Sequence, residues 1–172
     1  MATILLTGIA GFIGSWTGQA LADRGDTVSI VDDDAAPSVS LAIAPSSVSE
    51  ATGTATATAT LSVISGQDVT VNLAFSGTAT NVSDYTRSST QIVIPAGSTS
   101  GSVTLTAVQD AVDEPDETII VDISSVTNGT EIGTQQDSVT ITDDDVTPTV
   151  TLAIVPTTIA EAAGTTTVTA TL

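Results

Sequence analysis

The sequence predicts an all-β protein whose main part is an antiparallel sandwich of two sheets. Three observations lead to this prediction. The chain is rich in Thr, Ser, Ala and Val and has only 2% aromatic residues, and β-branched residues favour strands over helices. Short segments that alternate apolar and polar residues follow one another at the spacing of a sandwich. The chain also repeats part of itself at a distance typical of a whole domain.

The repeat defines the units of the chain. Residues Asp26–Leu61 align without a gap on Asp137–Leu172, at an offset of 111 residues, and 21 of the 36 positions are identical. This period is too long for a solenoid and suits a sandwich module. We therefore expect one complete unit over residues 37–145 and the first strands of a second over residues 148–172. A unit of about two strands cannot bury its own apolar face, so we expect it to pair with something or to fray.

Strand signals recur in order along the complete unit. TATATATLSV alternates so that Ala57, Ala59 and Leu61 share one face, and DVTVNLAFS places Val69 and Val71 on one face in the same way. TQIVIPAG, GSVTLTAV, DETIIVDIS and DSVTITDDD follow, separated by Gly, Asn, Ser and Asp turns. About seven short strands in roughly 110 residues, without a helical period, indicate an antiparallel two-sheet sandwich.

The charge balance excludes several kinds of partner. The chain has 20 acidic and 2 basic residues, and its formal net charge is −18. Nucleic-acid binding requires Lys and Arg that displace phosphate counterions, so we expect no nucleic-acid partner. No apolar run reaches the roughly 18 residues of a membrane span, so we expect no membrane insertion. Cysteine is absent, which excludes disulfides and thiolate metal sites.

The acidic residues are clustered. Glu50 lies in SVSEATG, Asp84 in SDYT, a dense group in QDAVDEPDET, and Asp143–Asp145 close the unit. Such carboxylates repel one another unless a cation bridges them, and Ca²⁺ takes six to eight oxygen ligands at about 2.4 Å. If the loops at one tip of the sandwich converge, acids far apart in the sequence form one site. The alternative is a solvated acidic tip without defined geometry.

Five motifs in a fixed order resemble the Calx-beta domain family. They are Glu50-x-x-Gly, Asp84-Tyr, Pro95-Ala-Gly, Asp113-Glu-x-x-Glu-Thr and Asp143-Asp-Asp. The resemblance covers residues 37–145 and resumes over residues 148–172. It implies an immunoglobulin-like sandwich of about seven strands with Greek-key connections, which binds calcium at one end. The family occurs in sodium–calcium exchangers, integrin β4 and long bacterial surface or secreted proteins.

The resemblance also implies a set of metal ligands. Carried over position by position, they are Glu50, Asp84, Asp110, Glu114, Glu117, Asp143, Asp144 and Asp145. The family's strongest calcium binders have consecutive acids where this chain reads Gln109-Asp110-Ala111. Fewer anionic oxygens imply fewer or weaker ions, with a dissociation constant of about 10⁻⁴–10⁻³ M. Asp32–Asp34 and Glu161 occupy equivalent places in the partial repeats, where we expect no ion because the other ligands are missing, unless a linker aspartate reaches the tip of a neighbouring unit.

Residues 1–33 follow a different pattern. A strand at Ile4–Thr7 leads into Gly8-x-x-Gly11-x-x-Gly14, a helix, and a second strand that ends on acids. This resembles the opening of NAD-dependent epimerase/dehydratase proteins, in which the glycines let the backbone approach a pyrophosphate. It predicts a short N-terminal βαβ-like or helical segment. The family's catalytic Tyr-x-x-x-Lys is impossible because the chain has no lysine, so we expect no enzyme.

Several origins explain this N-terminal segment. A gene fusion, a chimera and a mispredicted start all fit, and residues 26–33 also match the closing strand of a preceding sandwich unit. Residues 1–22 alternatively match a secretion signal, with an apolar ILLTGIAGFIGSW and an ALA before Asp23, although no Lys or Arg precedes the apolar run. A further alternative is that the apolar segment docks on a neighbouring subunit.

The leading functional hypothesis is a non-enzymatic, calcium-binding repeat module of a bacterial-type extracellular or cell-surface adhesive or structural protein. Its partners would be calcium ions and the neighbouring repeats or identical subunits. The alternative is a self-assembling filament subunit joined by strand addition, because the unfinished second unit exposes open edges. A remote alternative is an NAD-binding, epimerase-like protein.

Overall fold

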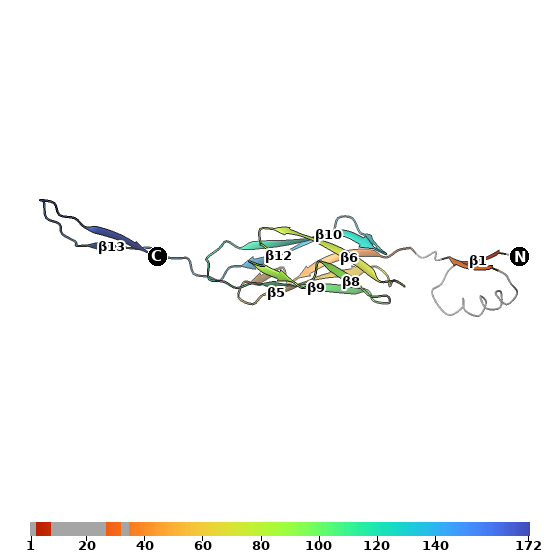
Figure 1. Ribbon diagram of the computed structural model, residues 1–172. Helices are drawn as coiled ribbons and strands as arrows, with labels where there is room; N and C mark the ends of the chain where they lie inside the picture. Colours follow the sequence, from red (N-terminus) through yellow and green to blue (C-terminus); the bar gives the residue numbers. More distant parts are fainter. Residues whose placement is uncertain (1–2, 8–26, 32–34) are drawn as a thin grey trace.

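A computed structural model describes residues 3–7, 27–31 and 35–172 (Figure 1). These residues form strands, turns and loops, and none of them is helical. The strands are β1 (Thr3–Thr7), β2 (Thr27–Val31), β3 (Ser38–Ala44), β4 (Ser47–Ser49), β5 (Thr54–Leu61), β6 (Val69–Gly77), β7 (Tyr85–Arg87), β8 (Gln91–Ile94), β9 (Ser100–Ala107), β10 (Glu117–Thr127), β11 (Thr130–Glu131), β12 (Gln136–Thr142), β13 (Thr151–Val155) and β14 (Thr167–Thr171). Within the described ranges, no helix qualifies as a membrane span.

Strands β3 to β12 form a sandwich of two five-stranded sheets, in the orders β4-β12-β10-β6-β8 and β11-β3-β5-β9-β7. All pairs are antiparallel except β4 with β12 and β11 with β3. The all-β sandwich prediction is therefore confirmed. Its seven longer strands are β3, β5, β6, β8, β9, β10 and β12. The other three have only two or three residues each, and the strand patterns of the sequence did not reveal them.

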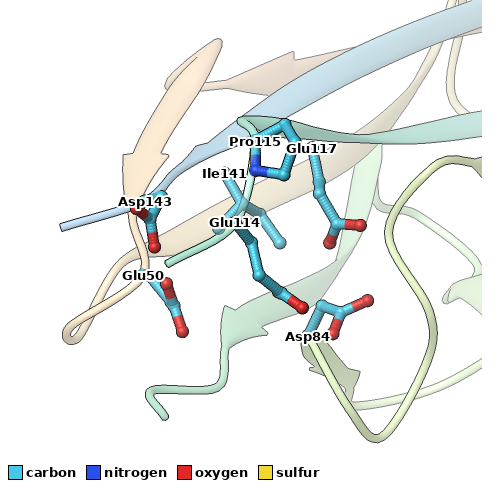
Figure 2. Close-up of a pocket in the computed structure, with 7 residues that line it drawn as sticks. All are labelled: Glu50, Asp84, Glu114, Pro115, Glu117, Ile141 and Asp143. Carbon is cyan, nitrogen blue, oxygen red and sulfur yellow. The ribbon is translucent and has the colours of Figure 1, made fainter. Parts of the chain in front are cut away.

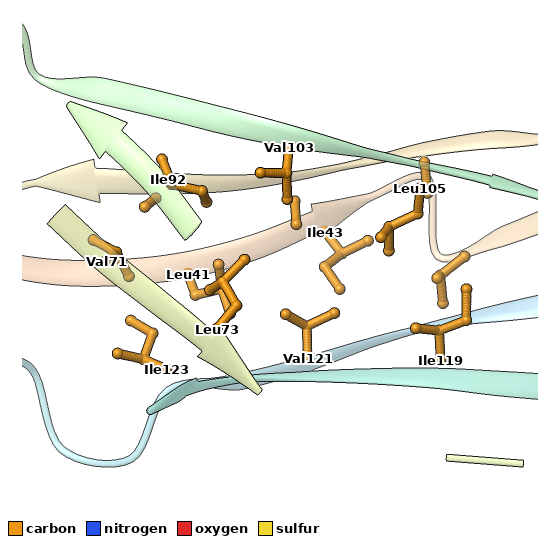
Figure 3. Packing of buried hydrophobic residues seen from close by; sticks show 14 of the residues in the cluster. Leu41, Ile43, Val71, Leu73, Ile92, Val103, Leu105, Ile119, Val121 and Ile123 are labelled. Carbon is orange, nitrogen blue, oxygen red and sulfur yellow. The ribbon is translucent and has the colours of Figure 1, made fainter. Parts of the chain in front are cut away.

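The core lies between the two sheets and is aliphatic, apart from Tyr85. Alternate residues of each strand point inward because successive side chains of a strand face opposite sides. Figure 3 shows Ile119, Val121 and Ile123 of β10 facing the side chains of β3 and β9 across the interior. On β5, the inward positions Ala57 and Ala59 are fully buried. The alternation read from the sequence thus defines which face of each strand is covered.

The outer edge of β3 is closed by side chains. Beyond its short pairing with β11, the backbone N–H of Leu41 donates to Gln135 Oε1 at 3.1 Å, and the N–H of Ile43 donates to Asp137 Oδ2 at 2.7 Å. Both acceptors lie at or beside β12 of the opposite sheet. An open edge strand is a template for pairing with other chains, and these two side chains remove that template.

Strands β13 and β14 form a separate antiparallel hairpin (Figure 1). Leu152 pairs with Ala170 and Ile154 with Val168. Every residue of both strands is exposed. These are the residues that the sequence assigns to the second unit, and the division of the chain into units stays a prediction.

At the N-terminal end, β1 and β2 pair in parallel with each other, from Thr3 with Thr27 to Thr7 with Val31. A parallel pair is the arrangement expected at the start of a βαβ unit. The predicted glycine loop, helix and Asp32–Asp34 lie outside the described residues. The epimerase-like interpretation therefore stays a prediction.

Candidate metal site at one tip of the sandwich

The topology brings four chain segments to one end of the sandwich. Strands β4 and β12 run parallel, so Glu50 after β4 and Asp143 after β12 emerge at the same end. Strand β10 is antiparallel to β12, which places its first residue, Glu117, at that end as well. Asp84 immediately precedes β7, whose first residue pairs with the end of β9. Acids that are distant in the sequence therefore meet at one tip.

The acids of the tip form two groups of three. Glu50, Asp110 and Asp145 each offer a carboxylate oxygen, and these oxygens lie within 4.8 Å of one another. Asp84, Glu114 and Glu117 form a second group by the same measure. A small pocket lies at the tip, and Figure 2 shows the carboxylates that line it, Asp143 among them, converging from different strands and loops. Carboxylate oxygens from several segments are the ligand type that calcium takes.

The three consecutive aspartates, Asp143–Asp145, lie in different surroundings. Asp143 lines the pocket and Asp145 belongs to the first group of three, and both are partly buried. Asp144 between them is exposed and belongs to neither group. This alternation is what an extended segment produces. Of the eight predicted ligands, the structure thus brings seven together and leaves Asp144 aside.

A tight turn holds Glu50 in place. The N–H of Gly53 donates to the Ser49 carbonyl at 2.8 Å, and a Cβ at residue 53 would lie 2.3 Å from that oxygen. Only glycine fits so close an approach, which explains the Glu-x-x-Gly motif. The N–H of Glu50 donates to the Thr142 carbonyl, and its Oε1 accepts the N–H of Asp110 at 3.0 Å. Glu50 is only 7% exposed, although it is an acid.

Burial and mutual repulsion disfavour the charged form of several carboxyls. Loss of hydration is the largest cause in each case, and it raises the pKa of Glu50, Glu114 and Asp145. The neighbouring carboxylates add repulsion to each of these groups. For Glu117, desolvation, a hydrogen bond shared with Asp84 and the charge of Asp84 raise the pKa to about 7. A divalent cation would reverse this balance because it favours the charged carboxylates.

Two carboxylate oxygens at the tip lack any partner. Asp143 Oδ1 and Asp145 Oδ2 are buried and receive no hydrogen bond. Buried polar atoms are normally paired, so these two are the signal expected of positions that a cation fills. Arg87 is the only basic residue within the described ranges, and it lies over the Phe75 ring, 4.4 Å from the centroid. It does not neutralise the tip. The donor set and the orphaned oxygens therefore fit a hard cation.

Two acids of the β9–β10 loop have a role that the sequence did not predict. Asp113 Oδ1 accepts a hydrogen bond from the Thr147 hydroxyl, and Asp116 Oδ1 accepts one from the Asp143 N–H, both at 3.3 Å. Neither acid belongs to the groups of three or lines the pocket. They contact the segment that leaves the sandwich after β12. Their neighbours Glu114 and Glu117 line the pocket instead.

A match to a known family model shows to which protein family this chain belongs. The Calx-beta domain model matches residues 32–145. The chain belongs to the Calx-beta domain family. The match begins at residue 32 and gives no support to the epimerase-like resemblance of residues 2–33. A search of curated proteins found no significant match.

Solved structures share the Calx-beta fold. The crystal structure of the apo form of the Calx CBD1 domain has a TM-score of 0.52 at 20% identity, over 64% of this chain and 100% of that one. CBD12 from CALX1.2 has a TM-score of 0.55 at 18% identity, over 67% and 48% of the two chains. The structure entitled calcium binding domain CBD12 of CALX1.1 has a TM-score of 0.53 at 20% identity, over 62% and 44%. This chain thus spans about half the length of the two CBD12 structures and all of the CBD1 structure.

Proposed function

We propose that this Calx-beta protein binds calcium at the tip of its sandwich and acts as a non-enzymatic structural module. The observation that supports the proposal most strongly is the pair of orphaned, buried oxygens on Asp143 and Asp145, beside two groups of three carboxylates. The proposed ligands are Glu50, Asp84, Asp110, Glu114, Glu117, Asp143 and Asp145. Asp144 is exposed, and we assign it a minor, long-range electrostatic role.

The module would act by stiffening the junction between consecutive units. Asp143 and Asp145 lie at the start of the short segment that leads from the sandwich to β13. An ion held by these residues and by the loops of the first unit would fix the direction of the chain at this point. Because the chain begins a second copy of the repeat, we place it in a tandem array of an extracellular or cell-surface adhesive or structural protein.

Calcium-dependent stability tests the proposal. Thermal unfolding of the full chain is followed in excess chelator and then across millimolar calcium, with magnesium at matched ionic strength as the control. A ligand that binds only the native state stabilises it by about 2.7 kcal/mol at one hundred times its dissociation constant. A rise in the melting temperature that is specific to calcium supports the proposal. Equal melting temperatures in chelator and in calcium would contradict the proposal and would mean that the acids form only a solvated surface.

Filament formation is a second candidate, supported by one observation. The β13–β14 hairpin exposes Leu152 and Ile154, which are apolar, and among the described strands β13 pairs only with β14. Such an edge and face suit strand addition between subunits. Sedimentation over a wide concentration range tests this candidate, and a monomer at every concentration, with and without calcium, would contradict it.

A further inference from the structure

Residues 113–117, at the end of the β9–β10 loop and the start of β10, contain four acids in two interleaved pairs whose contacts differ. Glu114 and Glu117 line the pocket and belong to one group of three. Asp113 and Asp116 are exposed, lie outside both groups, and each uses Oδ1 to accept a hydrogen bond from residues 143–147. Residues 113–117 thus contact both the pocket and the segment that leaves the sandwich, which we call the exit segment (residues 143–147).

The exit segment contributes the two least satisfied oxygens of the tip. Asp143 Oδ1 and Asp145 Oδ2 are buried without a partner, and Asp145 shares a group with Glu50 and Asp110. Residues after the end of a strand have no ladder hydrogen bonds to hold them. The described contacts that fix this segment on the loop are the Asp143 N–H bond to Asp116 and the Thr147 hydroxyl bond to Asp113. These two bonds bracket Asp143 and Asp145.

We infer that Asp113 and Asp116 are positioning residues, which hold the exit segment across the tip so that Asp143 and Asp145 present their buried oxygens to the calcium site. This inference rests on the proposed calcium function and assigns the two acids no contact with the ion. Some groups hold a metal ligand in position without contacting the metal. Removing such a group typically lowers metal affinity by 10- to 100-fold. Because the same bonds fix the exit segment, they also couple ion binding to the direction in which the chain continues.

The decisive test separates hydrogen bonding from charge at Asp116. Calcium affinity of the full chain is measured by calorimetric titration for Asp116→Ala and Asp116→Asn. The alanine variant loses the acceptor for the Asp143 N–H, and its affinity falls about tenfold, at the lower end of the usual effect. The asparagine variant keeps a carbonyl oxygen acceptor and loses the charge, and its affinity stays near that of the unaltered chain. A ligand role predicts instead that both variants lose affinity equally.

Two variants of Thr147 test the inference independently of Asp116. Thr147→Ser keeps the hydroxyl donor to Asp113, whereas Thr147→Val removes it at nearly constant shape. We expect the valine variant to bind calcium more weakly and the serine variant to match the unaltered chain. Asp122→Asn, on β10 outside the tip, is the control for loss of one negative charge, and it should leave the affinity unchanged.

The outcomes distinguish the inference from the function on which it rests. If the unaltered chain does not bind calcium, the proposed function fails. If it binds calcium but Asp116→Ala and Thr147→Val bind equally well, only the positioning role is overturned. Equal losses in Asp116→Ala and Asp116→Asn would also overturn it, since charge would then be the cause. Unfolding in chelator checks that each variant folds as the unaltered chain does.

Discussion

The β3–β5 and β13–β14 hairpins are two copies of a similar sequence in different surroundings. They share their register: Leu41 pairs with Ala59, and Leu152, 111 residues later, pairs with Ala170. In the first hairpin Leu41 is 8% exposed, whereas Leu152 is 68% exposed. Local sequence thus specifies the strands and their pairing, and only the opposite sheet supplies burial.

The same contrast applies to the turn that follows the first strand. The N–H of Gly164 donates to the Ala160 carbonyl at 3.0 Å, as the N–H of Gly53 donates to Ser49. Glu161 in this second turn is exposed, whereas Glu50 is buried and bonded to Thr142 and to Asp110. The turn forms from its own residues. A metal site requires in addition the ends of β10 and β12, which the second hairpin does not have among the described residues.

The largest expected difference between the two hairpins is the free energy of unfolding that is lost when an equivalent apolar side chain is truncated. Ile43→Ala should lower the free energy of unfolding by about 2–5 kcal/mol, since it removes a side chain buried between the sheets. Ile154→Ala, at the equivalent position, should change it by less than about 0.5 kcal/mol, because that side chain is 46% exposed on the hairpin. Chemical denaturation of the full chain measures both values. Equal losses would mean that the second hairpin is packed against something in solution.

Stabilisation by calcium should require the buried Glu50. It should not require Glu161, the equivalent residue of the second hairpin. Glu50→Gln should abolish the stabilisation of about 2.7 kcal/mol that calcium gives at one hundred times its dissociation constant, since it removes an anionic ligand. Glu161→Gln is the matched control and should keep the full effect. Thermal unfolding at saturating calcium compares the two variants. If both lost the effect, the site would not be confined to the first unit.

Substitution of the two turn glycines, Gly53 and Gly164, should also affect stability unequally. Gly53→Ala places a Cβ 2.3 Å from the Ser49 oxygen and 2.5 Å from Val48 Cβ, so Val48 in the core must move. We expect a loss of about 1–3 kcal/mol, typical of overpacking, together with weaker calcium binding. Gly164→Ala meets Ala160 at a similar distance but strains only the exposed hairpin. Global unfolding that is equally sensitive to both variants would contradict this account.

The pH dependence should be the smallest effect, because solvent screens the exposed acids. Glu117 has a pKa of about 7 in the folded chain and an ordinary value of 4.5. A raised pKa means that the folded state binds more protons between these values, so the metal-free chain should lose stability as the pH rises from about 4.5 to 7. Glu117→Gln should flatten this slope in urea titrations in chelator. A metal-free stability that increases over this range would contradict the assignment.

Some of this architecture could be predicted from the sequence because it depends on local pattern. Strand patterns in the sequence identified six of the seven longer strands, all but β3, and the buried positions Ala57 and Ala59 on β5. The short strands β4, β7 and β11 have two or three residues, and tertiary pairing alone defines them. Because side chains alternate between the two faces of an extended segment, the sequence could have predicted that Asp144 is exposed while Asp143 and Asp145 are partly buried. The bonds of Asp113 and Asp116 depend on how the β9–β10 loop folds against the exit segment, which spacing does not encode.

The most direct test of the central claim is a calorimetric titration of the metal-free full chain with calcium at constant ionic strength. We expect saturable binding with a dissociation constant of about 10⁻⁴–10⁻³ M, weaker binding of magnesium, and loss of the signal in Glu50→Gln. Magnesium is smaller and requires a stricter octahedral geometry than these converging carboxylates provide. A heat signal that never saturates, or one that is identical for the two ions and for Glu50→Gln, would contradict a built calcium site at the tip.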